Sequence, residues 1–304
     1  MTKIKADILL IMVTLFWGIS YWLIDVSLAE VGPFGLNALR FLIAFFIAVI
    51  LALPRLKTVN RTTIKYSALI GIALLFVYIG ATFGVMYTSL SNAGFLCALT
   101  VVITPILAFF VLKQKPDKKL AVVVLMCLIG IALLTLKGNL RPALGDLLCI
   151  MAAFAYAVDL LITEIAVRKK EVNAFQLGVF QLGFTGIYNL IISLLLETPE
   201  LPHSPNVWAA VLFLSVFCTG AAFIIQAIAQ QYTSASHVGV IFSLEPVFAG
   251  IVAFFLANEI LSGRAYVGAA LLVSSLFIME LDIFRLVTSF RSVIQSNRNG
   301  SRKN

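Results

Sequence analysis

The chain has 304 residues, of which 61% are hydrophobic and only 12% are charged. A soluble domain carries about a quarter charged residues, so this composition excludes an ordinary soluble protein. The formal net charge of +8 comes from short Lys and Arg clusters between apolar blocks, a pattern typical of topology signals and not of nucleic-acid binding. We therefore expect an all-α, polytopic membrane protein with no nucleic-acid partner.

Apolar runs of about 20 residues predict ten transmembrane helices, because this length matches a hydrocarbon core about 30 Å thick. The first run follows a basic start but has no small-residue cleavage site after it, so we interpret it as a retained span. The predicted spans are residues 6–25, 33–53, 65–88, 91–112, 119–137, 144–166, 173–196, 207–230, 236–256 and 264–284. The basic tail, residues 286–304, is expected to be cytoplasmic and disordered.

Basic residues are distributed very unevenly between the two sides of this predicted bundle. Ten spans place both termini on one side, which then carries 18 Lys and Arg residues against three on the other. Because positive residues accumulate in cytoplasmic loops, we expect both termini in the cytoplasm. The expected location is the cytoplasmic (inner) membrane.

The two halves of the chain, residues 1–140 and 141–285, resemble each other. Residues 87–114 align without a gap with residues 232–259, and both segments begin with Tyr-Thr-Ser. Each half contains five spans, an odd number, so the second half is predicted to cross the membrane in the opposite sense. Inverted repeats are typical of secondary transporters, whose sites lie near the midplane between the repeats.

Four motifs stand in an order and spacing that resembles the EamA-type branch of the drug/metabolite transporter superfamily. They are FWG (16–18), ALRF (38–41), YTSLSNAGFL (87–96) and YTSASHVGVIFSLEPVFAGIVAFFLANE (232–259). The resemblance implies two inverted five-helix repeats around a central cavity and export of small metabolites by alternating access. It does not imply one substrate. The fourth span ends in Lys113-Gln114 where the ninth ends in Asn258-Glu259, so no role is expected for that glutamate in the first half.

Asp159 lies among apolar residues of the predicted sixth span, about seven residues from its cytoplasmic end. Tyr156 and Thr163 share its helix face, which predicts a polar stripe directed toward protein and not lipid. A charge inside the bilayer costs about 2.5–3.5 kcal/mol on insertion scales, so such a residue is a functional candidate. Asp159 is expected to bind a substrate ammonium or carry a proton. The alternatives are a structural ion pair or hydrogen-bond anchor, and a tolerated polar residue at a wet rim of the bundle.

Two further charged residues lie inside predicted spans. Arg40 belongs to the ALRF motif, and because that motif recurs in the resembled family a structural or gating role is favoured over binding of a substrate carboxylate. Glu245 precedes Pro246, and proline predicts a helix break close to this carboxylate. Its alternatives are coupling or substrate binding, and pairing within the bundle.

Neutral side chains complete the candidate cavity, although each alone is also consistent with ordinary helix packing. They are Trp17, Ser20 and Tyr21 in the first span, Gln181 in the seventh and Gln226 in the eighth. The four cysteines lie inside apolar blocks without the spacing of a metal site. We expect neither a metal nor a cofactor.

These features predict a secondary transporter for a small amino-acid-like or amphipathic metabolite, with proton coupling as one option and export resting on the resemblance alone. An intramembrane enzyme acting on lipid or peptide through its carboxylates is the alternative from another class. Against it, the chain contains no H-E-x-x-H or G-x-S-x-G motif, and Asp146 lies about 20 Å from Asp159 along a straight helix. The sequence leaves the oligomeric state open, and a monomer is compatible with it.

Overall fold

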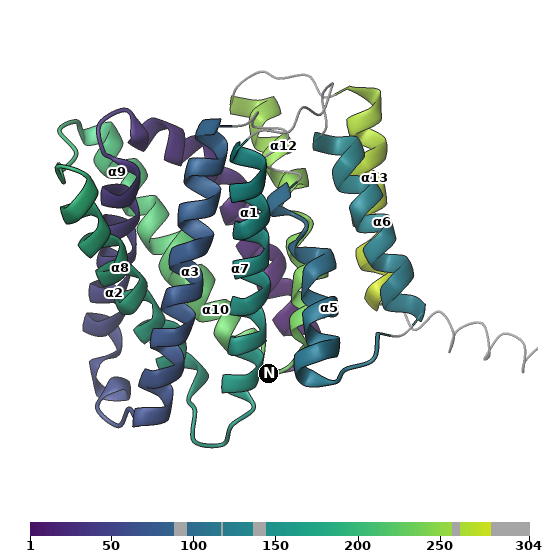
Figure 1. The fold of residues 1–304 in the computed structure, drawn as a ribbon, viewed down its shortest axis with the longest axis horizontal. Helices are drawn as coiled ribbons and strands as arrows, with labels where there is room; N and C mark the ends of the chain where they lie inside the picture. Colours follow the sequence, from purple (N-terminus) through teal and green to yellow (C-terminus); the bar gives the residue numbers. More distant parts are fainter. Residues whose placement is uncertain (88–95, 117, 136–143, 257–261, 281–304) are drawn as a thin grey trace, which may run out of the picture.

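The computed structural model describes residues 1–87, 96–116, 118–135, 144–256 and 262–280 (Figure 1). Helices form most of these ranges, and no strand occurs within them. The predicted tail, residues 286–304, lies outside the described residues. The expectation of an all-helical fold is therefore confirmed for the described part of the chain.

The helices of the described residues lie within or close to the predicted spans, although the eighth and ninth predicted spans are each divided. In residues 1–140 they are α1 (Lys3–Leu28), α2 (Pro33–Leu56), α3 (Arg61–Tyr87), α5 (Thr100–Leu112) and α6 (Lys118–Thr135). In residues 141–285 they are α7 (Leu144–Val167), α8 (Ala174–Leu196), α9 (Pro205–Phe213), the π-helix η1 (Leu214–Ala221), α10 (Ala222–Ala229), α11 (Ala235–Phe242), α12 (Glu245–Leu256) and α13 (Gly263–Glu280). By length and composition, seven helical segments of the described residues can cross a membrane, and α5 and most of α13 form shorter apolar helices.

Several helices begin where the sequence supplies a cap. Asn173, Ser204 and Ser234 precede α8, α9 and α11, and each side chain accepts a backbone N–H three residues later. Such caps satisfy donors that the first helical turn leaves without a partner. Pro33 and Pro205 occupy the first position of α2 and α9, where the missing N–H costs nothing. Local chemistry therefore fixes these boundaries.

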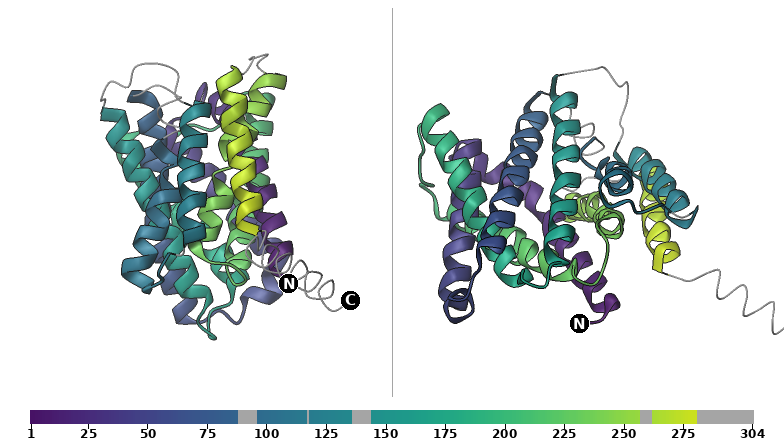
Figure 2. Two further views of the ribbon diagram at one scale, coloured as in Figure 1. Left: turned by 90° about the vertical axis from the view of Figure 1, so that its right-hand side faces the viewer. Right: turned by 60° about the horizontal axis from the view of Figure 1, so that its bottom comes forward.

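The helices form one bundle in which α6 and α13 lie side by side at one edge and α2 and α8 pack together at the opposite edge (Figures 1 and 2). Helices α3 and α7 are in extensive contact between these edges, and α1 contacts α9 to α12. The larger apolar core joins residues of α1, α2, α7, α8, α10 and α11. A smaller core lies around α6 and α13. The larger core therefore brings helices of both halves together.

Two interruptions of regular helix lie next to the candidate residues. Helix α11 ends at Phe242 and α12 begins at Glu245, which confirms the break predicted beside Pro246. The π-helix η1 interrupts the eighth predicted span, and nothing in the amino-acid composition of that span indicates it. Because π-turns in α-helices are frequent at functional sites, η1 directs attention to its neighbours.

Candidate functional site

Asp159 is fully buried on α7 and belongs to a chain of hydrogen bonds that reaches α10. Gln226 donates through Nε2 to Asp159 Oδ2 at 2.9 Å, and the Tyr156 hydroxyl donates to Gln226 Oε1 at 3.1 Å. Asp159 Oδ1 has no hydrogen-bond partner among the described residues, and the same holds for Thr163 Oγ1, one turn away. A buried carboxylate oxygen without a partner is costly, so it marks a place for a ligand, a proton or water.

Aromatic rings pack around the indole of Trp17, next to Tyr156 and its hydrogen bond to Gln226. The Trp17 ring lies edge-on to Phe242 with centroids 4.7 Å apart, and it also contacts Tyr156 at 5.9 Å and Phe223 at 5.8 Å. Its Nε1 donates to the carbonyl oxygen of Cys218 at 2.9 Å. Cys218 belongs to η1, so the π-helix holds the indole in place. Aromatic faces attract cations, and these rings lie beside a carboxylate.

Arg40 on α2 is only 2% exposed, and its guanidinium contacts a hydroxyl and aromatic rings where a buried arginine ordinarily contacts a carboxylate. Its Nε donates to Thr219 Oγ1 of η1 at 2.8 Å, and its guanidinium lies 5.2 Å from the ring centroid of Tyr78 and 5.9 Å from that of Phe41. Within the described residues no carboxylate forms an ion pair with it. An arginine keeps its charge when buried, so its free N–H groups are available to an anion.

Glu245 begins α12 and is partly buried. Arg40 and Asp159 are connected through contacting aromatic rings. Arg40 lies over the ring of Phe41, which contacts Phe223, and Phe223 contacts Trp17 beside Tyr156. Two of the three predicted intramembrane charges therefore belong to one group of side chains.

The other predicted residues are placed differently. Gln181 donates from Nε2 to the carbonyl oxygen of Phe223 at 3.2 Å, and its buried Oε1 has no partner among the described residues. The Ser20 hydroxyl donates to the carbonyl of Trp17 within its own helix, so it does not join the cluster. Tyr21 lies in α1, but its side chain falls outside the described part of the structure. Gln181 is therefore at the edge of the site, and Ser20 has a structural contact.

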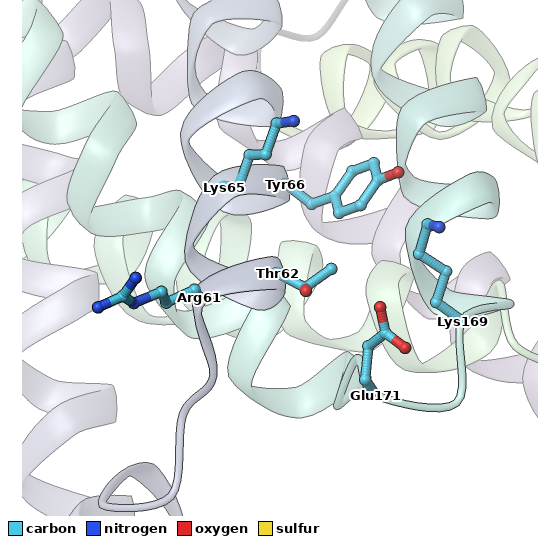
Figure 3. Close-up of a pocket in the computed structure, with 6 residues that line it drawn as sticks. All are labelled: Arg61, Thr62, Lys65, Tyr66, Lys169 and Glu171. Atoms are coloured by element: carbon cyan, nitrogen blue, oxygen red, sulfur yellow. The ribbon is translucent and has the colours of Figure 1, made fainter.

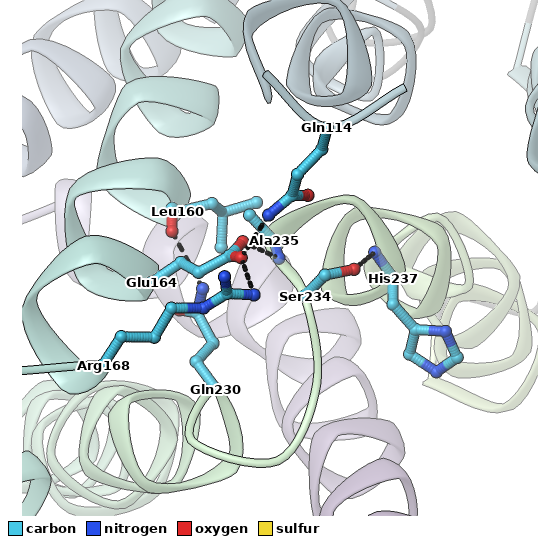
Figure 4. A network of polar contacts seen from close by, with 8 residues as sticks. All are labelled: Gln114, Leu160, Glu164, Arg168, Gln230, Ser234, Ala235 and His237. Atoms are coloured by element: carbon cyan, nitrogen blue, oxygen red, sulfur yellow. Dashed lines mark hydrogen bonds and ion pairs between the residues drawn. The ribbon is translucent and has the colours of Figure 1, made fainter. Parts of the chain in front are cut away.

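A second polar network lies at the end of the bundle that carries the N-terminus (Figure 4). Glu164 is fully buried on α7 and accepts from Gln114 Nε2 at 2.8 Å and from the backbone N–H of Ala235 at 2.6 Å. Arg168 pairs with the same carboxylate, and Gln230 donates to the carbonyl of Leu160 at 2.9 Å. Lys113 adopts a left-handed conformation with φ 55° at the end of α5, next to Gln114. Glu164 therefore ties α5 and α11 to α7.

A buried histidine contact joins α1 to α11 near this network. His237 Nε2 lies 3.2 Å from Asp7 Oδ1, and both side chains are less than 10% exposed. The pair connects the first helix of one half to the second half. Together with Glu164, it links α1, α5, α7 and α11 at this end of the bundle.

Sequence reasoning missed Tyr78, Thr219 and Glu164. Tyrosine and threonine are common in apolar helices, so hydropathy gives no signal for the first two. Glu164 stands near the predicted end of the sixth span, where a charge is ordinary. Its burial and its position opposite the first N–H groups of α11 become evident only in three dimensions.

Comparison with known proteins agrees with this architecture. The EamA-like transporter family model matches residues 4–136 and, separately, residues 143–281. A transporter of Archaeoglobus fulgidus is 30% identical over 92% of this chain and 87% of its own length, and one of Methanothermobacter thermautotrophicus is 28% identical over the same shares; both carry the name uncharacterized transporter. A solved crystal structure matches with a TM-score of 0.78 at 21% identity, covering 93% of this chain and 98% of the other, which supports the fold. This chain is a multi-pass membrane protein that belongs to the EamA-like transporter family.

Proposed function

We propose that this protein is a secondary transporter that exports a small amino-acid-like or amphipathic metabolite across the cytoplasmic membrane by alternating access. The family supports a transporter, and the buried Asp159 carboxylate with its unpartnered Oδ1 carries the assignment of the site. In this proposal the chain crosses the membrane ten times, with both termini in the cytoplasm. Residues 1–140 and 141–285 form the two inverted halves.

Contacts at opposite ends of the bundle support the inverted halves. Glu30, between the first two helices of one half, accepts from the backbone N–H groups of His203 at 2.7 Å and Ser204 at 3.1 Å, where the third helix of the other half begins. At the opposite end, Asn60 precedes the third helix of the first half and donates to the backbone carbonyl of Glu171, between the first two helices of the second half. In each half, the connection between the first two helices thus contacts the start of the third helix of the other half, once at each end of the bundle.

The charges of the site favour an amino-acid-like substrate. Asp159 and the aromatic rings beside Trp17 offer a carboxylate and π-faces to an ammonium group. The buried guanidinium of Arg40 offers N–H groups to a carboxylate. The contacting rings of Phe41, Phe223 and Trp17 connect Arg40 to Tyr156, one turn from Asp159. A zwitterion would satisfy both sets of free hydrogen-bonding groups at once.

The first experiment measures transport of labelled amino acids, amines and dyes in proteoliposomes, with and without a pH gradient. We expect the wild-type protein to accumulate a substrate against its gradient and Asp159→Asn to reduce that accumulation at least about tenfold, because loss of one charge-assisted contact costs about 1.5–3 kcal/mol. Glu200→Gln is the matched control, since Glu200 is an exposed carboxylate outside the site.

Three results would contradict parts of this proposal. Equal transport by Asp159→Asn and Glu200→Gln would remove Asp159 from the mechanism. Transport that ignores the pH gradient would remove proton coupling. Cleavage products from labelled phospholipid or peptide in the same vesicles, lost in Asp159→Asn, would favour the intramembrane enzyme instead.

A further inference from the structure

A basic cavity lies away from the Asp159 site, at the end of the bundle that carries the N-terminus. Its volume is about 330 Å³, and it lies between the first turns of α3 and the connection from α7 to α8. The lining residues are Arg61, Thr62, Lys65, Tyr66, Lys169 and Glu171 (Figure 3). Three cations against one acid leave the cavity positively charged.

The cations of this cavity outnumber its one acidic residue, Glu171. Within the described residues, none of Arg61, Lys65 and Lys169 forms an ion pair with a carboxylate. The Lys169 ammonium lies 5.9 Å from the ring centroid of Tyr66, which holds it over the cavity. Lys65 and Lys169 extend in the same direction from facing segments, with the Tyr66 ring between them, whereas Arg61 points away along the rim (Figure 3). The two ammonium groups and the Tyr66 hydroxyl therefore lie toward one side of the cavity, and the Thr62 hydroxyl lies toward Glu171 (Figure 3).

The surface of α3 that continues from the cavity is apolar and exposed. Leu69, Ile72 and Phe76 are 40%, 43% and 46% exposed. They follow Lys65 at i+4, i+7 and i+11, so all four share one face of the helix. Helix α3 is long and apolar enough to cross a membrane. A ligand with a charged head in the cavity and an apolar chain along this face would contact both surfaces.

We propose that this cavity binds the phosphate-bearing headgroup of an anionic phospholipid, with an acyl chain along Leu69, Ile72 and Phe76. Basic pockets between helices at a membrane surface bind such headgroups through charge-assisted hydrogen bonds. The apolar stripe distinguishes a lipid from a free phosphate, which would use the cations alone. Glu171 at the opposite wall disfavours a second negative group. The site is independent of the proposed transport site.

The test is retention of phosphatidylglycerol by the purified protein, measured by native mass spectrometry against equal phosphatidylcholine. We expect Lys65→Gln/Lys169→Gln to weaken retention of phosphatidylglycerol by on the order of tenfold, since it removes both ammonium groups that would contact the phosphate of the bound headgroup. Lys57→Gln/Lys170→Gln removes the same charge from exposed positions outside the cavity, so it should retain the lipid. Lys65→Arg/Lys169→Arg keeps both cations and should also retain it.

Two outcomes would overturn the proposal. Equal loss in both glutamine double variants would show that only the general charge of this surface matters. Thermal stabilisation by inorganic phosphate or glycerol phosphate equal to that by phosphatidylglycerol would assign the cavity to a soluble phosphate and not to a lipid. Stabilisation by phosphatidylglycerol alone, lost only in Lys65→Gln/Lys169→Gln, would support the lipid site.

Discussion

At the residue scale, the site is defined by hydrogen-bonding groups that the protein itself leaves without partners. Gln226 engages one oxygen of Asp159 and leaves the other free, and Thr219 engages one nitrogen of Arg40. Burial of both charges is costly unless something pairs with them. Within the described residues, neither Asp159 nor Arg40 forms an ion pair, so the protein holds two opposite buried charges that no ion pair neutralises.

Arg40→Gln separates recognition of a substrate carboxylate from a purely structural role. We expect the variant to lose transport of amino acids by at least about tenfold while it retains transport of the matching amines, because only the former need the guanidinium. The measurement compares each amino acid with its decarboxylated amine in proteoliposomes. If both classes are lost equally, Arg40 acts by supporting the helices and the zwitterion assignment is wrong.

The sequence predicted the charged and amide residues of the site better than their neighbours. Asp159, Arg40 and Glu245 stand out because a charge in an apolar run is rare. Tyr78 and Thr219 have no such signal, because their role depends on Arg40 reaching across from another helix. Hydropathy gives the period of a helix, but it does not say which faces of distant helices meet.

At the element scale, small residues allow helices of the two halves to approach closely. A Cβ added at Gly80 of α3 would lie 2.5 Å from the carbonyl oxygen of Leu148 and 2.9 Å from the backbone nitrogen of Ala152, both on α7. These are backbone atoms, so no side-chain movement relieves the contact. Close packing through small residues is a main source of helix association in membranes.

Gly80→Ala should therefore destabilise the protein by about 1–3 kcal/mol, the usual cost of overpacking, even though alanine favours helix. Unfolding of the detergent-solubilised protein by denaturant provides the measurement. Gly263→Ala is the control, since a Cβ at Gly263 meets nothing within 4 Å. Equal stability of the two variants would mean that α3 and α7 separate easily at this contact.

Helix boundaries were predictable because apolar length and caps determine them, as with Ser204 before α9. The π-helix was not, because LSVFCTGA does not differ in composition from an ordinary apolar helix. Its wider turns present the carbonyl of Cys218 to Trp17 and the hydroxyl of Thr219 to Arg40. Tertiary contacts thus stabilise a local geometry that the sequence alone does not indicate.

At the scale of the whole molecule, carboxylates hold both ends of the bundle together through backbone N–H groups. Glu164 accepts from the Ala235 N–H and from the side-chain Nε2 of Gln114 at one end, and Glu30 accepts from the N–H groups of His203 and Ser204 at the other. Hydrogen bonds from Ser204 and His203 lower the pKa of Glu30 below its ordinary value. The proposed alternating access requires one of these ends to open while the other stays closed.

Glu164→Ala should loosen the end that carries the N-terminus. The Ala235 N–H would lose its acceptor at a cost of about 1–3 kcal/mol, so its hydrogen exchange should accelerate about ten- to a hundredfold. Mass spectrometry of exchange in detergent or nanodiscs measures this. Glu171→Ala, an exposed glutamate at the same end, should leave exchange at Ala235 unchanged. Unaltered protection in Glu164→Ala would show that other contacts keep this end closed.

The π-helix makes the site depend on the number of residues as well as on their identity. Each π-turn contains about one residue more than an α-turn, and one residue corresponds to about 100° of rotation in an α-helix. The wider turns of η1 take up the additional residue, so loss of one residue there would convert them to α-turns and leave Phe223 and Gln226 of α10 facing Trp17 and Asp159. Loss of one residue after η1, between Phe223 and Gln226, has no such wide turn to absorb it and would rotate Gln226 away from Asp159. The position of a deletion therefore decides whether the site survives, even though every side chain that forms it is still present.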